Sequence, residues 1–307
     1  MKRTETQRFI ILVGLILAGL LLFGCAGKEI PIWGNEEVGF NLQYRLDDGQ
    51  KLNYEMSSKT KSDFNLMGNS TLTDEDALTR FSLVGTQTDS PDNLSGQVTV
   101  DDMTLKEIQS AMGESGEMER DLSKVIGKTF TLTFSPLGRE IDFAGVEKMT
   151  IDMGQMGGGE QSVRDRFRDL LIDLSNNPVK IGETWTSTVE EMEPSGLGDV
   201  QMKYVTNTTS KIEGFEKVDG YECLRISSQT TGTIGAEGET MGSTATMKGD
   251  ISGTGTSYFA YKEGLLVKSL GDAELHIDIQ IGGDQGLKIK LDIENEGGIK
   301  LTTPASL

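Results

Sequence analysis

The chain has 307 residues, with 29 Lys and Arg against 48 Asp and Glu, and a formal net charge of −19. A surface this acidic repels nucleic acid and anionic lipid headgroups, so we expect no nucleic-acid partner. Six prolines against 38 glycines argue against a Pro-rich stalk and favour glycine turns between strands.

The first 24 residues have the layout of a secretory signal. Lys2, Arg3 and Arg8 form a positively charged start, and residues 9–23 carry no charge. A secretory signal places an apolar stretch behind such a start, whereas a permanent transmembrane helix needs about 20 apolar residues. We therefore predict that residues 1–24 are a signal peptide that is removed.

The end of this segment reads Leu21-Leu22-Phe23-Gly24-Cys25 and resembles the lipobox of bacterial lipoproteins. The resemblance implies that Leu22 and Gly24 occupy the positions three and one before the cleaved bond. It also implies that Cys25 becomes the lipidated first residue, although Phe23 is bulkier than that family usually has there. An uncleaved anchor and an ordinary cleaved signal are the alternatives.

A lipid on Cys25 makes the membrane the first expected partner and the cell envelope the expected location. Ala26 follows the cysteine and suits the outer membrane if the organism has one; otherwise the anchor lies in the outer face of the cytoplasmic membrane. Residues 25–38 then form the lipidated cysteine and a tether. Without residues 1–24 the chain keeps 26 basic and 47 acidic residues, a net charge of −21.

Alternating apolar residues predict antiparallel strands in the remaining sequence. The clearest pattern runs through residues 275–293 on both sides of a Gly-rich loop at 282–286. Eight apolar residues would line one face of this hairpin because side chains alternate between the faces of a strand. Placing Ile281 opposite Leu287 brings all eight onto the same face.

That register also assigns the single histidine of the chain. It sets His276 opposite Asp292 and Asp278 opposite Lys290 on the solvent face, as ordinary cross-strand pairs. A histidine can otherwise act as a general base or a metal ligand. Cys223 also lies in a strand-like run, where a lone cysteine is usually a small core residue.

The sequence contains none of the common catalytic motifs. It has no Gly-x-Ser-x-Gly elbow, no His-Glu-x-x-His and no phosphate-binding loop. Acidic clusters such as Asp74-Glu75-Asp76 lack the spacing of a calcium loop, and Met149, Met153 and Met156 have no histidine or cysteine beside them to complete a soft-metal site. We therefore expect no enzyme activity, no metal and no cofactor.

A helical pattern lies between two β-rich segments. Its apolar positions are Val163, Phe167, Leu170, Leu171 and Leu174, before Asn176-Asn177-Pro178. This spacing predicts an amphipathic helix of about four turns in the connecting segment 161–177. Two shorter helices are predicted at 105–112 and 118–126.

Residues 39–160 and 178–307 share an arrangement of turn, strands and hairpin. The three pieces recur at offsets of 133, 123 and 128 residues, which suggests two related halves. Chance similarity between β sequences is the alternative, and the halves form either one sheet or two domains.

The segment from Pro178 to Trp185, with the turn Phe134-Ser135-Pro136-Leu137-Gly138 upstream, resembles a pattern in uncharacterised envelope lipoproteins. The expected fold class is α+β: a curved, half-barrel-like antiparallel sheet with the amphipathic helix packed on it. It is similar to the half-barrels of lipid-carrier lipoproteins. This resemblance implies a non-enzymatic protein that binds a lipid or another apolar ligand in the concavity.

The aromatic and apolar residues of the predicted hairpin and helix are the candidate ligand contacts: Phe130, Phe134, Phe143, Phe167 and Leu171. The alternative function is a structural or assembly module of the cell envelope that binds a protein partner through its acidic surface. A hydrolase whose site escapes motif searches is the third reading.

The lipobox generates a direct test. A thiol is required for lipidation, so Cys25→Ser should abolish incorporation of radiolabelled palmitate and leave the chain with its uncleaved signal. Cys223→Ser is the matched control and should incorporate label like the parent chain. Label retained in Cys25→Ser would contradict the lipidation site.

Overall fold

A computed structural model of the chain describes residues 31–303, apart from 89, 91, 112–113, 154–158, 169, 195–199, 241 and 284–285. The predicted signal peptide lies outside the described residues, and so do Leu22, Gly24 and Cys25. Within the described part, no helix combines the length and the apolar character needed to cross a membrane.

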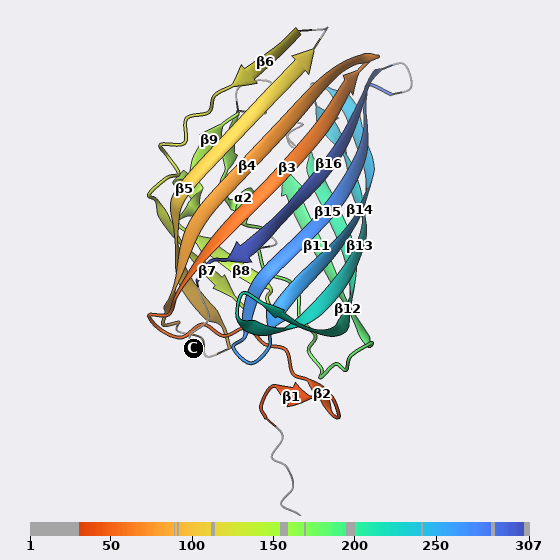
Figure 1. Cartoon of the computed structure of the whole chain (residues 1–307). Coiled ribbons are helices and arrows are strands. Elements are labelled where there is room, and N and C mark those ends of the chain that lie inside the picture. The colour runs from red at the N-terminus through yellow and green to blue at the C-terminus, as the bar shows by residue number, and fades with distance from the viewer. Residues whose placement is uncertain are drawn as a thin grey trace, which may run out of the picture.

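Strands make up nearly all of the regular structure (Figure 1). The strands are β1 Gly34–Asn35, β2 Gly39–Phe40, β3 Lys51–Leu66, β4 Asn69–Thr86, β5 Leu94–Ala111, β6 Glu114–Met118, β7 Thr129–Phe134, β8 Glu140–Ala144, β9 Thr150–Asp152, β10 Glu160–Ser162, β11 Thr184–Pro194, β12 Gln201–Val218, β13 Tyr221–Thr240, β14 Ser243–Ala260, β15 Leu265–Ile281 and β16 Leu287–Leu301. The helical elements are the 3-10 turn η1 Val146–Lys148 and α2 Arg164–Phe167.

Twelve of the strands form one antiparallel sheet in the order β11-β12-β13-β14-β15-β16-β3-β4-β5-β7-β8, with β6 added beside β5. The sheet is strongly curved, and it is not closed, because β11 and β8 are its two edges (Figure 1). The last strand, β16, pairs with β3. The two predicted halves therefore belong to one continuous sheet.

The predicted register of the 275–293 hairpin is confirmed. Ile281 lies opposite Leu287, and His276 lies opposite Asp292 in the β15–β16 pair. The eight apolar residues consequently share the concave face, and the charged residues between them point to the convex face. The Gly-rich residues 232–240 and 243–255 belong to the paired strands β13 and β14.

The predicted connecting helix is wrong beyond its first turn. α2 covers only Arg164–Phe167, and the backbone is already extended at Arg168. The N–H groups of Leu170, Ile172 and Leu174 donate to the Glu140 carboxylate, the Tyr44 hydroxyl and the Leu137 carbonyl. These tertiary partners replace the hydrogen bonds that a helix would supply.

The two shorter predicted helices are also wrong. Residues 105–111 belong to β5, and Met118 ends β6 before a stretch that contains turns. The fold is therefore a curved, open antiparallel sheet with very little helix, so the α+β class overstates the helical part.

We call the end of the sheet with turns at 219–220 and 261–264 the base, and the opposite end, with turns at 67–68 and 282–283, the rim. At the base, the concave face holds the main core. Phe81 and Phe167 are fully buried, and their ring centroids lie 5.1 Å apart at an interplanar angle of 76°. This edge-to-face packing joins the sheet to α2.

The hairpin register carries a pH prediction. Nδ1 of His276 lies 2.6 Å from Oδ1 of Asp292, and this hydrogen bond raises the pKa of His276 above its usual value of 6.5. The protonated imidazole therefore stabilises the fold fully below about pH 6.5, and the contribution disappears as the pH rises through the raised pKa. Asp292→Asn should lower the pKa of His276 measured by NMR.

The same variant should lower the urea midpoint of unfolding more at about pH 5.5 than at about pH 8.5, where the imidazole is neutral. Asp278→Asn is the control, because Asp278 lies opposite Lys290 on the same face. An equal loss of stability at both pH values would contradict the predicted role of the protonated pair.

Candidate ligand-binding cavity

A row of small residues crosses the concave face just beyond the aromatic core. Strand pairing places seven residues at one height on seven neighbouring strands, from β12 to β4: Ser210, Ser228, Gly255, Gly271, Gly297, Ser58 and Ala77. Side chains stand nearly perpendicular to a sheet, so this row leaves room between the sheet and whatever covers it.

The glycines of this row are required by the close approach of neighbouring strands. A Cβ atom on Gly271 would lie 2.8 Å from the carbonyl oxygen of Thr254, and one on Gly297 would lie 2.9 Å from that of Ser57. Contacts this short force the backbone to move. The row therefore combines two effects, because its residues permit tight strand packing and also leave space above the sheet.

A cavity of about 630 Å³ lies between this row and the inner segment, which we define as the described residues 149–153, 159–168 and 170–174. Ligand sites typically occupy about 300–1,000 Å³, so the cavity volume lies in the range of small-molecule sites. Met56, Ser58 and Ile299 line the sheet side, while Leu170 and Ile172 line the side of the inner segment.

The polarity of the cavity changes from base to rim. Near the base, Ile299 lies opposite Met56, and two residues further toward the rim Gly297 lies opposite Ser58. The next pair is Asn295 with Thr60, whose hydroxyl donates to the Asn295 side chain over 3.3 Å. Beyond this polar pair the concave face becomes apolar again, with Met202, Ile234, Met247 and Ile277 buried together.

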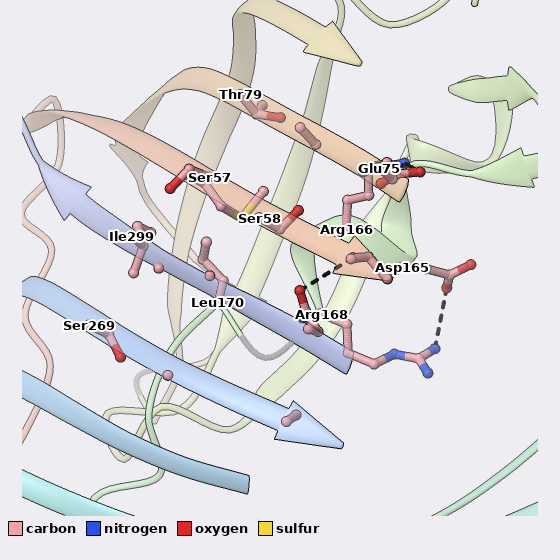
Figure 2. A pocket seen from close by; sticks show the side chains of 18 of the residues that line it. Ser57, Ser58, Glu75, Thr79, Asp165, Arg166, Arg168, Leu170, Ser269 and Ile299 are labelled. Atoms are coloured by element: carbon pink, nitrogen blue, oxygen red, sulfur yellow. Dashed lines mark hydrogen bonds and ion pairs between the residues drawn. The ribbon is translucent and has the colours of Figure 1, made fainter. Parts of the chain in front are cut away.

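An ion pair lies at the polar end of the cavity. Nη2 of Arg166 lies 3.1 Å from a carboxylate oxygen of Glu75, and both side chains are mostly buried. Arg168 lies 3.6 Å from Asp165 and 3.5 Å from Glu191. Figure 2 shows Arg166 and Glu75 at one end of the cavity and Ile299 toward the other. The arrangement places charged groups at one end, and apolar side chains together with the hydroxyls of Thr79 and Ser269 at the other.

A second ion pair lies beside the first. Glu107 on β5 pairs with Glu75 on β4 in the sheet register, and its carboxylate accepts two hydrogen bonds from Arg120, at 2.7 and 3.1 Å. Both side chains are only 7% exposed. Arg120 and Arg166 thus fasten two separate segments onto the concave face through neighbouring carboxylates.

Sequence reasoning missed both ion pairs. Their partners are 13 and 91 residues apart, so no local spacing reveals them. One signal was available: Glu107 continues the inward alternation of Met103 and Leu105. A carboxylate in phase with buried residues requires a cationic partner.

The predicted ligand contacts lie elsewhere. Phe130, Phe134, Phe143 and Phe167 are buried in the base core, and Leu171 packs partly buried against it. None of these five is among the described residues that line the cavity. In a helix Leu171 would share a face with Phe167, but in the extended chain it alternates with Leu170 and Ile172, which face the cavity.

Cys223 and Met149 are not among the described residues that line this cavity, whereas Met153 is. Cys223 is fully buried, and burial raises the pKa of its thiol to about 12. Met149 and Met153 fill the core, as methionine often does, while Met156 lies outside the described residues. The described part contains no group of three or more His, Cys, Asp or Glu residues that could hold a metal ion.

No family model matches the chain, and no curated protein matches it. Among solved structures, Pseudomonas aeruginosa OccK2 in complex with glucuronate is 8% identical, with a TM-score of 0.29 over 84% of this chain and 100% of that chain. A DUF1329 family protein from Desulfovibrio piger is 11% identical, with a TM-score of 0.14 over 82% and 87%. At these TM-scores neither likeness supports a conclusion about function.

The buried pair of Glu107 and Arg120 generates a stability prediction. Arg120→Met leaves a buried carboxylate without its cation, so it should lower the free energy of unfolding by about 3–5 kcal/mol. The double variant Glu107→Leu/Arg120→Met removes both charges and should recover most of that loss. Urea unfolding of the parent, Arg120→Met, Glu107→Leu and the double variant would measure the coupling, and additive losses would contradict it.

Proposed function

We propose that this chain is a lipid-anchored protein of the cell envelope that binds an amphiphile in the cavity under the inner segment and catalyses no reaction. The observation that carries the proposal is the cavity itself, where the apolar side chains of Met56 and Ile299 lie between the hydroxyls of Thr79 and Ser269 toward the base, and the charged Glu75 and Arg166 lie toward the rim. An envelope protein meets amphiphiles such as fatty acids and lipid fragments in its surroundings.

The apolar part of the ligand lies toward the base, against Met56, Ile299 and Leu170. Each buried methylene contributes about 0.8 kcal/mol, so a chain of several methylenes offsets the entropy lost on binding. The polar head lies toward Arg166 and Glu75, where it finds both hydrogen-bond donors and acceptors.

The difference in charge between the two faces of the sheet supports binding on the concave side. On the convex face, neighbouring strands carry charged residues at alternating positions, such as Lys59, Lys61, Asp74 and Asp76. These residues favour contact with water. An apolar ligand therefore gains most free energy beneath the inner segment.

The proposal is tested by filling the cavity. Ser58→Phe places a ring where the row of small residues leaves space, so affinity for the fluorescent polyene fatty acid cis-parinaric acid should fall at least about tenfold, a loss of about 1.4 kcal/mol. Titration of the purified chain, followed by probe fluorescence, measures this change.

Ser252→Phe is the matched control. Ser252 is exposed and lies in the opposite phase on β14, on the convex face, so the same substitution there should leave affinity unchanged. Circular dichroism and urea midpoints verify that both variants fold. Equal affinity in the parent and Ser58→Phe would exclude this cavity as the site, and a chain that binds no amphiphile in the probe titration and in native mass spectrometry would favour the assembly module.

A further inference from the structure

Four apolar side chains are exposed together below the base of the sheet. They are Ile32, Val38, Ile181 and Phe215, at 71%, 44%, 38% and 43% exposure. Ile32 and Val38 flank the small hairpin of β1 and β2, which hangs from the base in Figure 1. Ile181 precedes β11, and Phe215 lies near the base end of β12.

Backbone and ring contacts hold these positions in one place. Phe40 and Val179 exchange two backbone hydrogen bonds of 2.8 and 3.0 Å, which join the hairpin to the segment before Ile181. The ring of Phe40 lies 5.6 Å from that of Phe215, edge to face. Asn41 N–H also donates to the carbonyl of Trp33 over 3.0 Å. We call the four exposed residues the base patch.

The docked hairpin shortens the predicted tether. Residues 31–38 were expected to belong to it, but Trp33 packs against the core and Gly34 pairs with Phe40. Only five residues lie between Cys25 and Pro31, the first described residue, so the two are six residue steps apart. At about 3.3–3.6 Å per residue, a lipid on Cys25 holds the hairpin within about 20 Å of the bilayer.

We propose that the base patch is a docking surface for the lipid bilayer that carries the Cys25 anchor. The short tether keeps the bilayer at a high effective concentration beside the patch. Apolar contact is the interaction that this surface can make, because the mature chain carries a net charge of −21 and gains nothing from anionic headgroups. Docking holds the sheet with its base on the membrane and its rim away from it.

The test uses the full lipidated chain bound to phosphatidylcholine vesicles whose acyl chains carry bromine, a short-range quencher of tryptophan. Trp33 lies beside the patch, and Trp185→Phe makes Trp33 the only tryptophan. Trp33 should be quenched, and Ile32→Glu/Val38→Glu should lower the ratio of docked to undocked molecules at least about tenfold, since it replaces two apolar contacts with charges.

Leu72→Glu is the matched control, because Leu72 is 51% exposed on β4 near the rim. This variant should be quenched like the parent, and all variants should stay on the vesicles through the lipid of Cys25. An unquenched Trp33 in the parent, equal quenching in the patch variant, or a chain without lipid on Cys25 would overturn the proposal.

The base patch proposal rests on the lipid anchor but not on the cavity. The patch variant should bind cis-parinaric acid like the parent, and Ser58→Phe should leave the quenching of Trp33 unchanged. Loss of fatty-acid binding alone would therefore concern the cavity, and loss of quenching alone would concern the patch.

Discussion

The structure depends on the backbone register of the curved sheet, which shifts at bulges between Ile212 and Gly214 and between Tyr258 and Phe259 near the base but is continuous at the level of the row of small residues. Pairing from β12 to β4 aligns residues of seven strands at one height on the concave face. A slip of one residue in any of these pairs would turn a strand's inward side chains to the solvent. The aromatic core, the row of small residues and the polar pair of Thr60 and Asn295 exist as separate levels because the register is kept.

The inner segment is the second element that the register positions. Beyond α2 its backbone is not helical, so the N–H groups of Leu170, Ile172 and Leu174 need partners outside the segment. Glu140, Tyr44 and Leu137 supply them. The ion pair of Arg166 with Glu75 also fastens the inner segment to β4. The pair of Arg120 with Glu107 fastens a neighbouring segment to β5. Buried ion pairs contribute little net stability, but they allow only one placement of the segments that carry the arginines.

These features follow one another in a fixed order along the strands, from the base toward the rim. The small N-terminal hairpin lies below the base, and the main core fills the concave face at the base above it. The cavity lies further along the strands, with its apolar end toward the core. The sheet side of the cavity is made of paired strands, and the inner segment opposite it is held by hydrogen bonds and by the ion pair of Arg166 with Glu75.

The sequence by itself determined the hairpins that alternate cleanly and their local pairing, but not the strand at 105–111, where it predicted a helix. The 275–293 hairpin and its pair of His276 with Asp292 followed from alternation alone, because side-chain period and turn length specify neighbouring strands. The tertiary structure decided the rest. The stripe at 163–174 has helical spacing, yet the sheet and the base loops bind its backbone in an extended form, which moves Leu170 and Ile172 to the cavity. The residues of the row of small residues come from seven different strands, and only the pairing of these strands in the sheet brings them to one height.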